Sequence, residues 1–377
     1  MTQITDTRPA QALPTRFREA EARGARIGRL LRVVGRVPDG VDEALMERIG
    51  QALLETDEPG AALADAMRTR ADGRVTHAQL RIALHEGIDA VPDAPEALRT
   101  FMDVVTDTPS WVDWDRIERG GQVFTRFGKT AADVLMQLSL IGGYRFGGPT
   151  DLLVATGGLT GGQTPRRLAE TQYWTIKLAS ADSLRPGGEG WRLTVHVRAM
   201  HALVNASFEP EWDIARWGLP INMADQAGTL GLFDGTLLIG ARALGIPISR
   251  REAADLMHLW RYVGWLLGVH PDFLTDDERE RHRINLHVLL AAGGQTPAGV
   301  ELARSTVAAQ RERVYPGWPS ALQGWRARYE QERMLSMMTV FLGRQGMRDL
   351  GLTWRLPWAF GTTFATNVWR HRVVGRL

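Results

Sequence analysis

The sequence predicts an all-α fold, and two observations carry that prediction. Apolar residues recur with the 3.6-residue helical period from Phe17 almost to the end of the chain, and glycine and proline separate the periodic stretches. Strand signals are few. The best is Leu193–Arg198, which is rich in β-branched residues, but its apolar register continues at helical spacing through Met200 and Val204. We therefore expect a helix there as well.

The individual helices are placed by their periodic stretches and by their start signals. Asp113 and Ser249 stand before such stretches as N-caps, and Pro297 and Pro319 stand where a first helical turn would be. The glycine-rich residues 157–162 are expected to form a loop. The predicted helices cover residues 41–54, 76–87, 96–106, 113–127, 130–145, 165–183, 192–206, 222–243, 249–267, 276–291, 297–313, 318–341 and 357–371.

The chain is predicted to form one domain. Its 377 residues, of which 44% are hydrophobic, can bury a large core, and neither an internal repeat nor a linker divides the chain. We expect a disordered N-terminal tail over residues 1–16 and a single all-helical domain over residues 17–377. Residues 17–100 would form an N-terminal helical subregion of this domain.

Composition excludes several functions. Without cysteine there is no disulfide, iron–sulfur cluster, thiolate-bound haem or covalently attached haem, so any haem must be held by His, Met or Tyr. The net charge is only +2 and no dense basic tract is present, which argues against a nucleic-acid partner. The N-terminus lacks the pattern of a signal peptide, and the longest apolar stretches, such as Met334–Leu342, are too short to span a bilayer. We expect a cytoplasmic protein.

The sequence lacks the motifs of common hydrolases and nucleotide-binding proteins. The pairs His196/His201 and His282/His287 are each five residues apart, which separates their side chains by about 140° on a helix. Neither pair can easily hold a metal ion from a single helix. A haem site with a single histidine remains open, because the porphyrin itself supplies four ligands.

His201 is the strongest candidate for a haem ligand. It shares the face of a predicted helix with Val197 and Val204, and an imidazole on an apolar stripe needs a polar partner. Iron is one such partner, and a backbone carbonyl is the alternative. Arg198, three residues earlier, could pair with a haem propionate, or with solvent or a carboxylate. His258, His270 and His287 compete for the iron, including as a sixth ligand.

A second helix carries a stripe that begins polar and becomes apolar. It comprises Arg167, Thr171, Trp174 and Leu178 at spacings of four, three and four. Arg167 and Thr171 could line a polar corner of an otherwise apolar pocket. The alternative is that the first turns of this helix simply face solvent.

Several segments occur in an order that resembles the latex-clearing protein (rubber oxygenase) family, which also includes MpaB-type oxygenases. The two central segments are Arg167–Thr171 and, about twenty-five residues later, Val197–Val204. No single segment is highly specific, but together they cover roughly residues 50–290. The others are Pro109–Trp114, Gly120–Phe127, Ser139–Leu140, Tyr144, Thr156–Leu159, Pro220–Asn222, Asp225–Gln226, Thr229 and Trp260–Val269.

The resemblance implies an all-helical fold like a globin core with added helices, with one non-covalent haem b buried between helices. It makes His201 the proximal iron ligand and Arg167 and Thr171 residues of the haem and dioxygen site. Arg198 and Thr229 are expected to contact the cofactor. Asp151 falls near the position of a proposed catalytic base.

The sequence departs from the rubber-cleaving members at further positions. Glu170 stands where some members have a lysine that caps the iron, and Asn205 stands in place of an arginine. Together with the missing secretion signal, these departures argue against a polymer substrate.

Three functions follow as alternatives. The first is a haem b-dependent oxygenase that uses dioxygen to oxidise or cleave a hydrophobic small molecule. The second is a haem carrier or sensor without turnover. The third is a helical interfacial binding protein without haem, whose aromatic and basic stretch Trp354–Arg372 would touch a membrane surface or only cover the core.

Overall fold

The computed structural model describes residues 12–157 and 163–372, and within these ranges it contains helices but no strand. This confirms the predicted all-α class. The helices are α1 (Glu21–Ile27), α2 (Arg29–Val34), α3 (Glu43–Ala52), α4 (Glu58–Arg68), α5 (His77–Glu86), η1 (Ile88–Ala90), α6 (Glu96–Thr106), α7 (Trp114–Phe127), α8 (Lys129–Val134), η2 (Leu135–Leu140), α9 (Ile141–Gly143), α10 (Pro149–Ala155), α11 (Thr164–Leu178), α12 (Glu189–Phe208), η4 (Glu209–Glu211), α13 (Ile214–Trp217), α14 (Met223–Phe233), α15 (Gly235–Ala243), α16 (Arg250–Leu266), η5 (Pro271–Phe273), α17 (Glu278–Ala291), α18 (Pro297–Ala309), η6 (Ser320–Leu322), α19 (Gln323–Asp349) and α20 (Trp358–Arg372).

Three of the four predicted start signals act locally as expected, whereas Pro319 lies before the short helix η6 and α19 begins only at Gln323. The carboxylate of Asp113 accepts a hydrogen bond from the backbone of Arg116 at the start of α7. Ser249 and Glu252 form a capping box at the start of α16, and Pro297 is the first residue of α18. These caps satisfy backbone N–H groups that have no partner inside a helix. Local sequence therefore defines where these helices begin.

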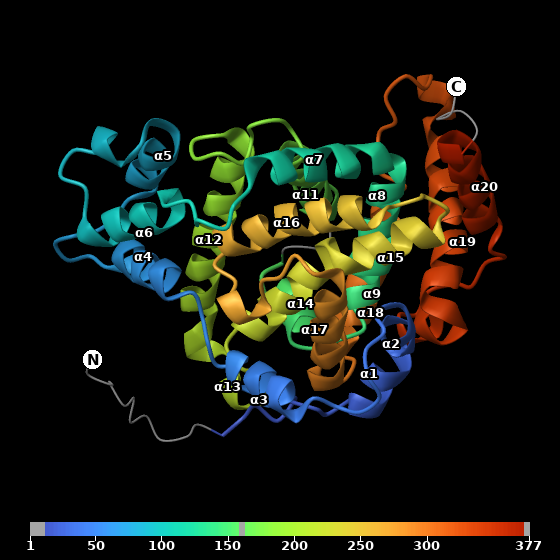
Figure 1. Cartoon of the computed structure of the whole chain (residues 1–377), viewed down its shortest axis with the longest axis horizontal. Coiled ribbons are helices and arrows are strands. Elements are labelled where there is room, and N and C mark those ends of the chain that lie inside the picture. The colour runs from blue at the N-terminus through green and yellow to red at the C-terminus, as the bar shows by residue number, and fades with distance from the viewer. Residues whose placement is uncertain (1–11, 158–162, 373–377) are drawn as a thin grey trace.

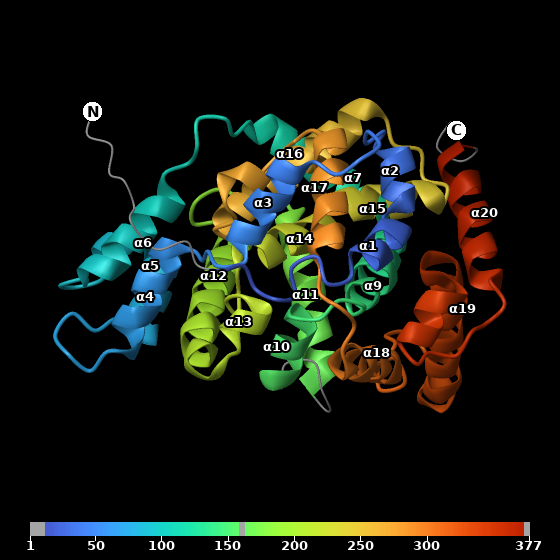
Figure 2. The same cartoon turned by 90° about the horizontal axis from the view of Figure 1, so that it is seen from below.

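The helices form an elongated molecule with three parts (Figure 1). Helices α4, α5 and α6 lie at one end, α19 and α20 lie at the other, and the remaining helices form the middle. Helix α12 joins the first part to the middle, because it packs on both α4 and α11. Figure 2 shows α18 and α10 along one side of the middle part.

Helices α7 and α16 form the tightest pair of the middle part. A Cβ atom added to Gly120 on α7 would lie only 2.5 Å from the carbonyl oxygen of Asp255 on α16, so this approach requires glycine. Around the pair, one cluster of buried apolar side chains extends from Val37 to Ala359 and includes Trp260 and Tyr262. The predicted N-terminal subregion thus shares a core with the rest of the chain.

A second core lies between α9, α18 and α19. It contains Ile141, Tyr144, Leu302 and Met338. The segment that leads into it is η2, a π-helix that interrupts the predicted helix 130–145. Within this π-helix, Leu135 and Leu138 pack on the large core, and Met136 and Leu140 pack on the second core.

The structure corrects several predicted boundaries. The tail expected over residues 1–16 does not extend that far, because Arg16 is buried and pairs with Asp225 at 2.6 Å. Residues 1–11 lie outside the described residues, as does most of the predicted loop 157–162. The predicted helix 222–243 divides at Asp234, whose backbone is not helical.

No helix in the described ranges is long and apolar enough to cross a membrane.

Candidate haem site and adjoining cavity

The two helices that carry most of the predicted site residues, α11 and α12, form an antiparallel hairpin. The ammonium of Lys177 pairs with the carboxylate of Glu189 at 2.8 Å, and the Trp174 indole donates to the hydroxyl of Thr194 at 3.0 Å. Because the two helices run in opposite directions, seven residues from Thr194 toward the C-terminus of α12 cover the same length as seven residues from Trp174 toward the N-terminus of α11. His201 and Arg167 therefore lie at about the same height along the hairpin.

His201 is half-buried, but its Nδ1 atom is enclosed and has no hydrogen-bond partner. Burial lowers the pKa of the imidazole to about 4, and the nearby Asp57 carboxylate opposes this shift. The ring is thus neutral at neutral pH, which is the form that binds a metal. The backbone carbonyl expected as the alternative partner is not bonded to this nitrogen.

Arg198, one turn before His201, is paired within the chain. Its Nε and Nη2 atoms donate to the two oxygens of Asp57, each at 2.6 Å, and the two side chains are only 5% and 9% exposed. The guanidinium also lies over the Phe101 ring. A carboxylate of the protein is therefore its partner, which is the alternative to a propionate that the sequence left open.

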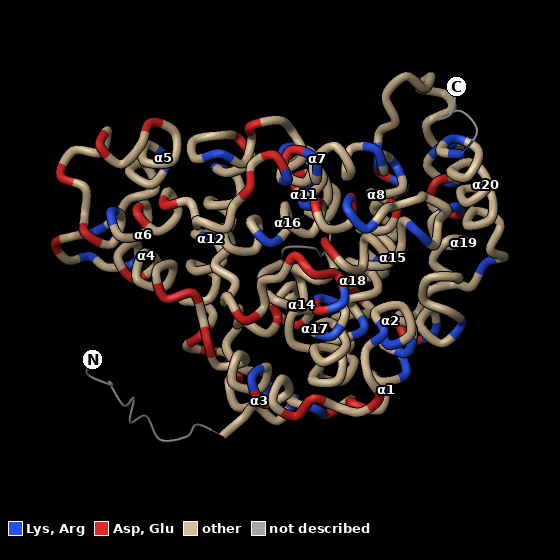
Figure 3. The backbone as a smooth tube through the Cα atoms, viewed as in Figure 1, with Lys and Arg blue, Asp and Glu red and all other residues tan. Residues whose placement is uncertain are grey.

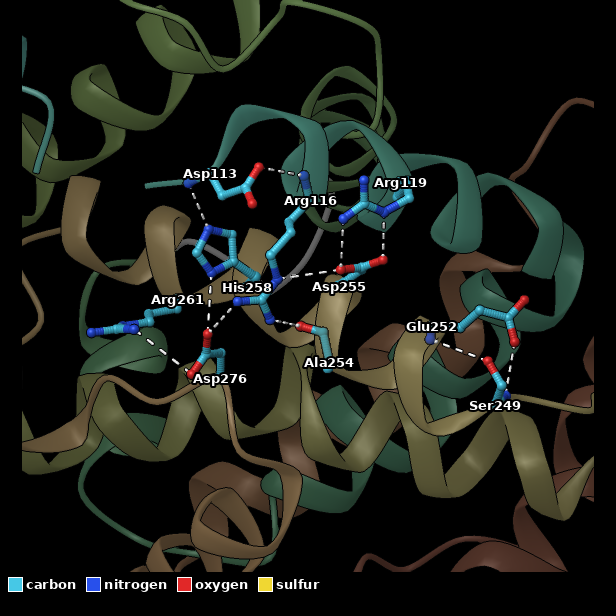
Figure 4. A network of polar contacts seen from close by, with 10 residues as sticks. All are labelled: Asp113, Arg116, Arg119, Ser249, Glu252, Ala254, Asp255, His258, Arg261 and Asp276. Atoms are coloured by element: carbon cyan, nitrogen blue, oxygen red, sulfur yellow. Dashed lines mark hydrogen bonds and ion pairs between the residues drawn. The ribbon is translucent and has the colours of Figure 1, made fainter. Parts of the chain in front are cut away.

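Two competing histidines are fully engaged with protein groups. His258 accepts a hydrogen bond from the backbone of Asp113 through Nε2, and its Nδ1 contacts the Asp276 carboxylate at 3.2 Å (Figure 4). His287 likewise accepts from the backbone of Asp42 and bonds the carbonyl of Arg283. Neither ring has a nitrogen left for iron.

The histidine of Figure 4 belongs to an ionic network between α7 and α16. Arg116 and Arg119 on α7 both pair with Asp255 on α16, and Arg116 also pairs with Asp276. These ion pairs hold α7 and α16 together where the two helices approach closely. They also explain the buried position of His258 without a cofactor.

The third competitor, His270, is engaged through one ring nitrogen. It is partly exposed at the surface, and its Nδ1 accepts a hydrogen bond from the backbone of Asp272. In the described ranges no group of three or more His, Asp or Glu side chains could hold a metal ion. The donor set around His201 thus fits a cofactor that brings its own ligands, as haem does.

A cavity of about 600 Å³ lies on the other face of α11. Its walls come from α7, α8, η2, α11, α14 and α19, with Arg313 and Tyr315 from the loop before η6. Most of the lining is apolar: Phe124, Leu135, Met136, Leu140, Leu168, Ile176, Leu232, Phe233 and Met334. A cavity of this size and character can hold a drug-sized hydrophobic molecule.

One part of the cavity wall is polar. Asp133 pairs with Arg333, and Glu330 pairs with Lys129 at 3.0 Å and with Arg333 at 3.3 Å. Burial raises the pKa of Asp133 to about 6, with a contribution from Glu330, although Arg333 and Lys129 oppose the shift. Gln137 donates its amide to Asp133 at 3.1 Å.

The structure divides the predicted site residues between these places. Thr171 and Thr229 line the cavity, whereas His201 and Arg198 do not. Arg167 is exposed on the first turns of α11 and lies 3.7 Å from Glu170. The sequence predicted one site for these residues, but in the structure they lie on two faces of α11.

Asp151 lies in neither place. Its Oδ2 atom accepts hydrogen bonds from the backbone of Gly148 and from the hydroxyls of Thr150 and Thr296, at 3.0 to 3.2 Å. The bond from Gly148 caps the N-terminus of α10. Asp151 is absent from the cavity lining, so its position does not support the expected role as a base in that cavity.

Sequence reasoning missed Asp57, Asp133 and Gln137. Asp57 stands before Glu58-Pro59, a typical helix start, so the pattern indicates a cap; its carboxylate turns to Arg198 instead. Asp133 and Gln137 are four residues apart on a predicted helix, and this spacing could have indicated their contact.

Comparison with known proteins places these features in context. Residues 120–371 match the family described as "ER-bound oxygenase mpaB/B'/Rubber oxygenase, catalytic domain". A rubber oxygenase of Streptomyces sp. (strain K30) is 24% identical over 214 residues, which are 55% of this chain and 52% of the relative. The chain thus matches about half the length of that relative. The fold is similar to that of latex clearing protein LCP in the closed state, with a TM-score of 0.67, 19% identity, and coverage of 86% of this chain and 85% of that chain.

Proposed function

Because the chain belongs to the mpaB and rubber oxygenase family, we propose that it is a haem b-dependent oxygenase that uses dioxygen to oxidise or cleave a hydrophobic, unsaturated small molecule. The observation that carries the proposal is the neutral imidazole of His201, whose Nδ1 is enclosed without a partner. Bound haem b would supply an iron centre that activates dioxygen.

His201 would hold the iron, and residues at the same height on α11 would help to bind the cofactor. Arg167 carries a permanent charge on an exposed turn, so it would be able to pair with a propionate of the cofactor or with another anionic group. Thr171 and Thr229 would border both the cofactor and the cavity. Arg198 would act through Asp57, which it holds beside His201.

The cavity beside α11 supports an enzyme more than a haem carrier or sensor. A carrier needs a haem site but no second apolar chamber of about 600 Å³ next to it. We propose this cavity as the substrate chamber. Asp151 is not part of the proposal, because its carboxylate is occupied at the start of α10.

The test is the visible absorption spectrum of the purified protein, with a pyridine haemochrome assay on the same sample. We expect a Soret band and a b-type haemochrome near one haem per chain. A protein without a Soret band, also after incubation with haem, would contradict the proposal and favour the haem-free binding protein. Haem without oxygen consumption on any unsaturated apolar substrate would favour the carrier or sensor.

We also propose that the C-terminal stretch Trp354–Arg372 contacts a membrane surface. Its exposed side chains include Trp354, Leu356, Trp358, Phe364 and Trp369, although Ala359 and Asn367 are buried against the body. Arg residues lie along α19 and near the end of α20, and on α19 they alternate with Glu and Asp (Figure 3). Aromatic and basic side chains together favour an anionic lipid surface. A cytoplasmic location stays a prediction.

Sedimentation with vesicles tests the membrane contact. We expect the protein to pellet with vesicles that contain phosphatidylglycerol, and less with pure phosphatidylcholine. A Trp369→Ser variant, which alters an exposed side chain, should pellet less. Equal recovery in the supernatant with both vesicle types would contradict the contact.

A further inference from the structure

The cavity wall contains a hydrogen-bond acceptor that has no donor. Gln137 lies on the π-helix η2, lines the cavity and is only 2% exposed. Its Oε1 atom is enclosed without a hydrogen-bond partner. An enclosed polar atom of this kind costs free energy until a donor reaches it.

The chemistry of its neighbour fixes which way the Gln137 amide points. The amide nitrogen donates to the Asp133 carboxylate at 3.1 Å. A carboxylate that is paired with arginine accepts hydrogen bonds, so it selects the NH₂ side of the amide. The free atom is therefore the oxygen, and the missing group must be a donor.

The charges around Gln137 already have partners. Arg333 bonds both oxygens of Asp133, and Glu330 is shared between Lys129, Arg326 and Arg333. These contacts leave two enclosed polar atoms of the cavity lining without a partner: the Gln137 amide oxygen, which needs a donor, and Nε of Arg326, which needs an acceptor. A hydroxyl can act in both ways. A ligand there need not supply a charge.

The same charges restrict the ligand class. A ligand carboxylate would bring acceptor oxygens against the Gln137 oxygen and close to Asp133 and Glu330. A ligand ammonium would meet an excess of positive charge, because Lys129, Arg313, Arg326 and Arg333 also line the cavity. A neutral donor such as a hydroxyl has neither penalty.

We propose that the cavity takes an amphipathic alcohol, with its apolar body against the Leu, Met and Phe side chains and its terminal hydroxyl donating to Oε1 of Gln137. This inference rests on the proposed function for the role of the cavity as the substrate chamber, and it names the class of molecule that the chamber selects. Gln137 is the specificity-determining residue.

Direct binding of a matched pair of probes tests the proposal. 1-Dodecanol and its methyl ether have the same apolar chain, but only the alcohol can donate a hydrogen bond. Equilibrium dialysis against the purified protein, at its measured haem content, gives both dissociation constants. We expect the alcohol to bind about tenfold more tightly, the effect of one buried hydrogen bond.

Two variants separate the role of Gln137 from general effects on the cavity. Gln137→Leu should bind both probes equally. Gln172→Leu removes an amide from the same cavity, but from a side chain whose oxygen already accepts from Arg313, and should keep the preference for the alcohol. Circular dichroism would verify that both variants are folded.

Several outcomes would overturn the inference. Equal binding of both probes by the unaltered protein would mean that water or a shifted side chain satisfies Gln137. A preference that survives Gln137→Leu would place the hydroxyl elsewhere, and no binding of either probe would reject the cavity as a ligand site. The assay needs neither haem nor dioxygen, so its result is independent of the haemochrome test.

Discussion

Two buried arginine–aspartate pairs, Arg198–Asp57 and Arg333–Asp133, lie in different parts of the molecule and have different neighbours. The first lies beside the His201 imidazole, and the second holds the amide of Gln137. In each pair the aspartate directly faces the arginine, and an uncharged side chain beside the pair has an unpartnered atom. One site therefore has an imidazole nitrogen without a partner, which the proposed function assigns to haem binding, and the other has an amide oxygen without a donor, which the further inference assigns to a hydroxyl.

Removing the imidazole should have the largest effect on the first site. We expect His201→Ala to lower haem retention on the order of 100-fold or more, since even changes to groups behind a metal ligand cost 10- to 100-fold. The readout is the Soret absorbance per chain after gel filtration. His196→Ala, on an exposed face of the same helix, is the matched control and should keep its haem. Full haem in His201→Ala would remove His201 as the ligand.

Breaking the pair behind His201 should reduce stability. In Asp57→Asn, the buried Arg198 charge loses its ionic partner, so we expect the free energy of unfolding to fall by about 3 kcal/mol. Urea denaturation measures this loss. Arg166→Ala, which breaks the exposed pair with Glu170, should cost less than about 1 kcal/mol. Equal losses in the two variants would mean that burial does not distinguish the pairs.

The double variant sharpens this test. Asp57→Leu combined with Arg198→Met replaces both charges by apolar groups, and no unpaired charge remains. We expect it to be more stable than Asp57→Asn alone. A double variant as unstable as the single one would show that the pair contributes more than mutual neutralisation.

The two sites should respond to pH with opposite signs. For His201 the pKa is about 4 when folded and 6.5 when unfolded, so the unfolded chain binds more protons and this contribution to stability rises from pH 4 to 6.5. For Asp133 the pKa is about 6 when folded and 3.8 when unfolded, so its contribution falls from pH 4 to 6. Each can change the slope by up to about 1.4 kcal/mol per pH unit.

Urea denaturation of haem-free protein between pH 4 and 6.5 measures these slopes. Relative to the unaltered protein, Asp133→Asn should make stability rise more steeply with pH, and His201→Leu should make it rise less steeply. Changes of the same sign in both variants would contradict the assigned titrations.

The sequence predicted those features that depend on neighbouring residues. The caps of α7 and α16 and the helical register through Leu193–Val204 are local, and the structure confirms them. The partner of Arg198 is not local, because Asp57 lies 141 positions away and resembles an ordinary cap. The division of the predicted helix 222–243 has the same cause: Asp234 there meets the buried Arg281 of α17.

The candidate site was predictable in part for the same reason. The stripe on α11 and the apolar face of His201 are helical patterns, so the sequence indicates both. It does not indicate that Thr171 and His201 lie at different faces of α11, because this depends on how α12, α14 and α19 pack around that helix. The open oxygen of Gln137 likewise depends on the whole wall.

The π-helix η2 has a consequence for how this chain could tolerate insertions and deletions. Its wide turn changes the phase of one continuous rod, so that Leu135 faces the large core and Ile141 and Tyr144 face the second core. The wide turn absorbs one extra residue, because about five of its residues turn as far as about four residues of an α-helix. Deleting one residue within 135–140 is therefore expected to convert the wide turn to regular α-helix and to leave Ile141 and Tyr144 facing the second core. Deleting one residue from the regular helix α8 instead would rotate everything after it by about 100° and remove both side chains from that core.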